Sequence, residues 1–60
     1  MRRIYYIIML DGEPATVTVW QDPAEPMYYA SLRDDPHAAQ GNGFSPTDAV
    51  RDLEVSLSYT

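Results

Sequence analysis

At 60 residues, the chain is expected to form one small domain spanning residues 1–60, near the lowest size at which a single core stabilises a fold. It contains no cysteine, which excludes both a disulfide framework and a thiolate metal site. Nine acidic residues against four basic ones, none of them lysine, give a net charge of −5. Nucleic acid is therefore a poor direct partner, because binding to phosphates depends on clustered basic side chains.

The first predicted element is a strand over residues 3–10, with the sequence RIYYIIML. The apolar run from Ile4 to Leu10 is only seven residues long and no small-residue cleavage site follows it, which argues against a secretory signal. Isoleucine and tyrosine favour strands, and Asp11-Gly12 is typical of a turn. The composition therefore predicts a buried strand, and the missing signal features predict a cytoplasmic protein.

A second strand is predicted over residues 15–21, where apolar and polar residues alternate. Val17 and Val19 fall on one face, and Trp20 falls on the other. The connection from the first strand is short, so the two strands should pair antiparallel as a hairpin. Two prolines in the following DPAEP segment then end the second strand.

A third strand is predicted over residues 27–33, joined to the second as a meander. Residues 34–44 show no periodicity and contain proline, asparagine and two glycines, which predicts a loop. Loops of this length on small domains often carry function. The alternative is that this segment only connects the third strand to the helix.

A helix is predicted over residues 46–58. Ser45 suits the N-cap, and Pro46 suits the first helical position because it lacks the amide that would go unpaired there. Apolar residues follow at helical spacing, and they must be buried against the sheet. The predicted fold class is α+β, a three-stranded antiparallel β-meander packed against one C-terminal helix (β-β-β-α).

Gly41 and Gly43 precede this helix, where glycines can either cradle a phosphate or turn the chain. A cradle usually has a lysine or a longer glycine pattern, and here Asp48 adds negative charge. We therefore predict that these glycines turn the chain, and that Phe44 staples the helix entrance to the core.

The segment LRDDPHAAQGNGFSPTDAVRDL resembles the HicB-like antitoxin family, over about the last two-thirds of the chain. The matching parts are Asp35-Pro36 in the loop, the two glycines before the helix, and Ser45-Pro46-Thr47-Asp48-Ala49 at the helix start. Pro36-His37-Ala38 replaces the family's usual Pro-Gly-Cys, and no C-terminal DNA-binding segment is expected after Thr60. The resemblance implies a domain like the family's N-terminal one, which binds a toxin but does not bind an operator.

Catalytic and metal-binding patterns are scarce. His37 is the only histidine, and it lies near Asp34 and Asp35 in the predicted loop. Neighbouring residues on an extended chain point apart, and neither a fourth metal ligand nor a nucleophile beside a base is evident. We therefore expect no enzyme activity, no catalytic residue, no metal and no cofactor.

The sheet should leave one face open, because a single helix covers only the other. Aromatic side chains on an open face are typical interface anchors, although tyrosine also tolerates half-burial. The predicted partner-binding residues are Trp20, Tyr29, Asp34, Asp35 and His37. The open face or an edge strand would serve a homodimer or a protein partner, and no membrane is expected to take part.

The resulting hypothesis is a non-enzymatic, antitoxin-like protein-binding module that masks the positive surface of a basic nuclease or toxin. One alternative is a phage or mobile-element inhibitor of a host defence nuclease that mimics nucleic-acid charge. Another is a structural homodimer with no other partner.

Overall fold

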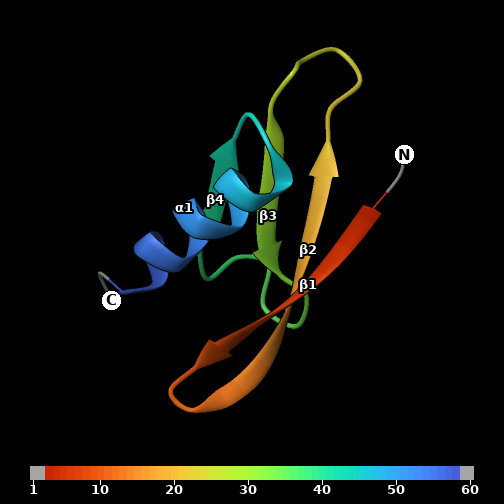
Figure 1. The fold of residues 1–60 in the computed structure, drawn as a ribbon. Coiled ribbons are helices and arrows are strands. Elements are labelled where there is room, and N and C mark those ends of the chain that lie inside the picture. Colours follow the sequence, from red (N-terminus) through yellow and green to blue (C-terminus); the bar gives the residue numbers. More distant parts are fainter. Residues whose placement is uncertain (1–2, 59–60) are drawn as a thin grey trace.

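The computed structural model describes residues 3–58, which form one four-stranded antiparallel sheet and one helix (Figure 1). The strands lie in chain order across the sheet, and the helix follows the last strand. The α+β class is confirmed, while the expectation of three strands is wrong. The elements are β1 (Arg3–Leu10), β2 (Glu13–Gln21), β3 (Tyr28–Leu32), β4 (Gln40–Gly43) and α1 (Pro46–Ser58).

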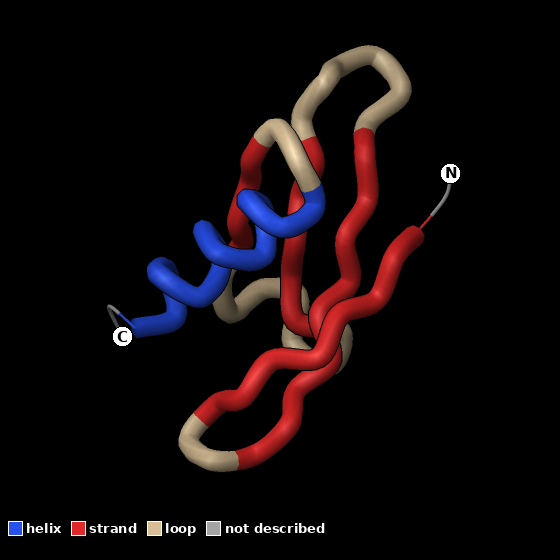
Figure 2. Tube along the Cα trace, in the orientation of Figure 1, coloured by secondary structure: helices blue, strands red, loops and turns tan. Residues whose placement is uncertain are grey.

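β1 and β2 form a long hairpin, with every residue of β1 paired to β2 (Figure 2). A two-residue turn joins the strands, with φ of 51° at Asp11 and 82° at Gly12. Positive φ at both central residues is the type I′ geometry, whose twist matches that of the flanking strands. The pair Leu10 and Glu13 therefore closes the hairpin.

The core lies between α1 and the face of the sheet that carries Val17, Val19 and Ala30. These three side chains have no solvent exposure, as the alternation along β2 and β3 predicts. α1 packs on β4, β3 and β2. The buried apolar residues are Ile8, Val17, Val19, Ala30, Ala49, Val50 and Leu53.

β1 is not the buried strand that its composition predicted. Ile8 is its one buried residue, and most of the others are exposed. The reason is its position, because β1 lies at the edge of the sheet and its hairpin with β2 extends past the part that α1 covers (Figure 1).

β4 lies inside the predicted loop of residues 34–44, so this part of the prediction is wrong. Residues Gln40–Gly43 pair with β3. Neither Gly41 nor Gly43 has positive φ, so these glycines do not turn the chain. A Cβ at Gly41 would overlap the backbone of Ala49 and Leu53, and would lie 2.8 Å from the Leu53 Cα. The glycines instead allow the helix backbone to lie directly on β4.

The helix start follows the predicted capping. The Ser45 hydroxyl accepts a hydrogen bond from the Asp48 amide at 3.1 Å. The expected Phe44 staple is wrong, since this side chain is 73% exposed. A Cβ at Gly43 would lie only 2.6 Å from the Asp48 Cβ, so it is Gly43 that lies against the helix start.

Candidate functional site

The candidate site is the open face of the sheet, opposite α1. Side chains alternate between the two faces of a strand, so the neighbours of the buried valines point away from the helix. In the β2–β3 register, Thr18 lies opposite Ser31 and Trp20 lies opposite Tyr29. These two cross-strand pairs form the centre of the open face.

Trp20 and Tyr29 stack on each other, with ring centroids 6.0 Å apart and ring planes at 28°. The Tyr29 hydroxyl donates a hydrogen bond to Glu25 Oε2 at 2.5 Å, which ties the ring pair to the β2–β3 loop. The same loop is held by the Gln21 side-chain amide, which donates to the Pro26 carbonyl at 3.2 Å. The two rings therefore form a positioned aromatic platform.

The hydrogen bond to Glu25 also raises the pKa of Tyr29 above its usual value of 10.0, with smaller contributions from desolvation and from the charges of Glu25 and Asp22. A hydrogen bond donated by the neutral phenol is lost when the phenol ionises, so the carboxylate favours the neutral form. Tyr29 thus stays a neutral hydrogen-bond donor throughout the physiological pH range.

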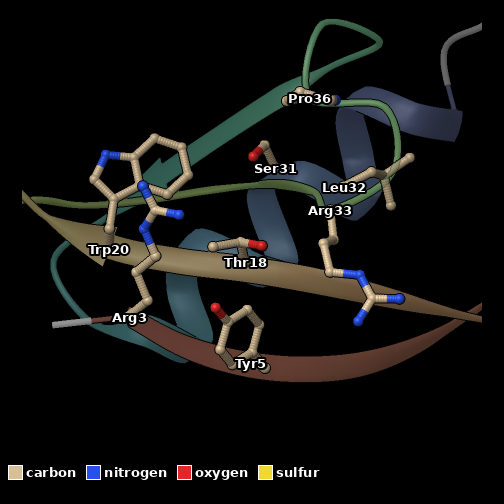
Figure 3. A pocket seen from close by; sticks show the side chains of 8 residues that line it. All are labelled: Arg3, Tyr5, Thr18, Trp20, Ser31, Leu32, Arg33 and Pro36. Carbon is tan, nitrogen blue, oxygen red and sulfur yellow. The ribbon is translucent and has the colours of Figure 1, made fainter.

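A shallow depression of about 500 Å³ lies beside this platform (Figure 3). Thr18 and Ser31 are only 9% and 5% exposed, but their hydroxyls, which have no hydrogen-bond partner among residues 3–58, are not fully buried and reach the surface of the depression. These hydroxyls are left to bond water or a bound group. The depression is lined by Arg3, Tyr5, Thr18, Trp20, Ser31, Leu32, Arg33 and Pro36.

The charges around the depression are mixed. Arg3 and Arg33 line it, although the chain as a whole is acidic. Arg33 Nε lies 3.4 Å from Asp34 Oδ1, and because both side chains are exposed this ion pair contributes little to stability. The depression therefore offers cationic groups and hydroxyls between acidic loops.

Two of the predicted partner-binding residues, Trp20 and Tyr29, lie together in the structure. Asp34, Asp35 and His37 lie exposed on the β3–β4 loop. Pro36 of that loop lines the depression, so the loop forms one end of the site. The predicted residues therefore belong to two parts of one face, the aromatic platform and the acidic loop.

Sequence reasoning missed five polar and aromatic residues among those that line the depression. The alternation of side chains along the strands could have identified them, since each lies on the open-face side of its strand or at the strand end. The alternation that placed Val17 and Val19 in the core also places their neighbours on the opposite face. The missed residues are Arg3, Tyr5, Thr18, Ser31 and Arg33.

Within residues 3–58, no group of three or more histidine, aspartate or glutamate side chains is placed to hold a metal ion. The described helix is also neither long nor apolar enough to cross a membrane. Comparisons with protein-family models, with curated proteins and with solved structures give no match to this chain. The resemblance to HicB-like antitoxins thus stays a prediction.

Proposed function

We propose that this chain is a non-enzymatic, antitoxin-like protein-binding module that neutralises a basic nucleic-acid-handling protein in the cytoplasm. The observation that carries the proposal is the open face, where the stacked Trp20–Tyr29 pair lies half-buried beside the acidic β2–β3 loop. In this proposal the chain contacts its protein target alone, with no direct role for nucleic acid or membrane.

The aromatic platform supplies the apolar part of the contact. Tryptophan and tyrosine bury large areas at interfaces and lose little side-chain entropy, so they often dominate binding free energy. The Tyr29–Glu25 hydrogen bond fixes the platform before binding, which lowers the entropy lost on association. We therefore expect the platform to govern the dissociation rate.

The acidic loops supply the attraction for a basic target. Asp22 and Glu25 lie in the β2–β3 loop, while Asp34 and Asp35 lie in the β3–β4 loop. Clustered negative charge raises the association rate with a positive surface, and added salt screens the effect. Arg33 and the hydroxyls of Thr18 and Ser31 then donate hydrogen bonds to an acidic or carbonyl group of the target, which fixes its orientation.

The test begins with affinity capture from a lysate of the source organism, followed by identification of the captured protein and assay of its nuclease activity. The matched variants are Asp34→Asn/Asp35→Asn and Asp48→Asn/Glu54→Gln, which change the net charge equally at the β3–β4 loop and on α1 respectively. We expect the loop variant to reduce the association rate several-fold at low salt, and the helix variant to have a much smaller effect.

Two results would contradict the proposal. One is a captured protein with an acidic binding surface, or one whose nuclease activity is unchanged by this chain. The other is equal weakening by the loop and helix variants, because that result would indicate general charge attraction rather than contact through the open face.

A further inference from the structure

β1 is an edge strand with an unusually apolar composition. It has eight residues, against four in β4 at the opposite edge of the sheet. Tyr5, Ile7 and Met9 are 58%, 66% and 63% exposed. Proteins normally protect such an edge with proline, lysine, a bulge or a covering segment, because a free edge can pair with a strand of another chain. β1 contains neither proline nor lysine, and α1 packs on the other strands.

The backbone groups of Tyr5, Ile7 and Met9 point toward this free edge. In an antiparallel pair, hydrogen-bonded and non-hydrogen-bonded residue pairs alternate, and the pair that closes a two-residue turn is hydrogen-bonded. Leu10 and Glu13 close the turn, so Ile7 and Thr16 form a non-hydrogen-bonded pair. The Thr16 carbonyl accepts from the Arg33 amide at 2.9 Å, on the β3 side, which agrees with this assignment.

The sequence of β1 and its turn is complementary to itself in one antiparallel register. When Ile7 lies opposite Ile7 of a second copy, Tyr5 lies opposite the second copy's Met9. The same register places Arg3 beside the second copy's Asp11 at both ends of the contact. A shift to a centre at Tyr6 would place Arg3 opposite Met9 and lose this charge pairing.

We propose that two copies of this chain associate by antiparallel pairing of their β1 edges in the Ile7-centred register. The two four-stranded sheets then join into one sheet of eight strands. The two-fold axis runs perpendicular to the sheet, so both helices lie on one side and both open faces on the other. This dimer goes beyond the proposed function and leaves the Trp20–Tyr29 platform of each copy accessible.

The first test is sedimentation equilibrium of the wild-type protein and of two variants over micromolar to millimolar concentration. Ile7→Lys places two positive charges opposite each other at the axis, while Phe44→Lys makes the same change at an exposed residue far from β1. We expect Ile7→Lys to weaken dimerisation at least tenfold and Phe44→Lys to leave it unchanged. Circular dichroism verifies that both variants are folded.

The second test reads the register directly, because the natural chain has no cysteine. Ile7→Cys should form a disulfide between copies, since paired residues in such a register have Cα atoms about 5.5 Å apart. Tyr5→Cys alone should not, because four residues of strand separate the two sulfurs by about 13 Å. A mixture of Tyr5→Cys and Met9→Cys should form the mixed disulfide.

A protein that stays monomeric throughout the concentration range would overturn the proposal. So would a dimer in which Ile7→Cys fails to cross-link, or one that Phe44→Lys weakens as much as Ile7→Lys. The Trp20–Tyr29 platform takes no part in this contact, so loss of target binding would leave these results unchanged.

Discussion

Individual residues in this domain matter most where the backbone leaves no space for a side chain. Gly41 lies in β4 against the helix backbone at Ala49 and Leu53. Glycine is required at this position by the short distance to the helix backbone and not by its backbone angle, since its φ is not positive. Gly12 is the opposite case, because it has a φ of 82° and no atom near its absent side chain.

Substituting Gly41 should test this contact. We expect Gly41→Ala to lower the free energy of unfolding by roughly 1–3 kcal/mol, because the new methyl group forces α1 away from β4. The measurement is urea denaturation followed by circular dichroism. Asn42→Ala is the control, since Asn42 is exposed and its backbone amide still donates to Asp52 Oδ2. Equal stability of the two variants would show that the helix adjusts freely.

Tyr29 should ionise at a higher pH than an unperturbed tyrosine. The main cause is its hydrogen bond to Glu25, so Glu25→Gln should lower the Tyr29 pKa toward the usual value, whereas Glu54→Gln on α1 should not. Because the folded-state pKa is the raised one, the stability from this bond is fully present below about pH 10 and is lost as pH rises through the folded pKa. Carbon-13 NMR of the tyrosine Cζ would measure the titration, and an unchanged Tyr29 pKa in Glu25→Gln would refute the assignment.

At the scale of elements, the sequence predicts those whose residues have strong local preferences. α1 coincides with its predicted range because Ser45, Pro46 and the apolar spacing all favour a helix start there. β4 was not predictable in this way, since Gln-Gly-Asn-Gly has no strand preference and is held by β3 and α1. The exposure of β1 depends on its place at the sheet edge, which composition alone does not give. The open face needed the β2–β3 register as well as the alternation within each strand.

The contribution of the Ser45 N-cap to the stability of α1 can be tested by substitution. We expect Ser45→Ala to lower the free energy of unfolding by ~1 kcal/mol, because the Asp48 amide loses its acceptor. Ser45→Asn should retain most of the stability, since asparagine caps helices equally well. Thr47→Ala, at an exposed position in the first turn, serves as the control in thermal unfolding. A Ser45→Ala variant as stable as wild type would show that the cap is dispensable.

The whole molecule carries far more negative than positive charge, with nine acidic and four basic residues. Among residues 3–58 the one ion pair is the exposed contact of Arg33 with Asp34. Repulsion between like charges should therefore outweigh attraction in the folded state.

This balance predicts that salt stabilises the protein. We expect the thermal unfolding midpoint at fixed protein concentration to rise between 0.01 and 0.15 M NaCl, where the screening length falls from about 30 to about 8 Å. Asp35→Asn should reduce the rise, because it removes a repelling charge that takes no part in the Arg33–Asp34 ion pair. A midpoint that falls with salt would mean that attractive pairs dominate instead.

The order of strands across the sheet also has a consequence for folding kinetics. Each strand pairs with its neighbour in the chain, and α1 packs on the strand just before it. Contacts between segments close in sequence cost little loop-closure entropy, so domains of this kind tend to fold faster than all-β domains with distant strand pairings. A new chain is therefore expected to complete its own core before its β1 edge meets another chain, so that association follows folding rather than competes with it.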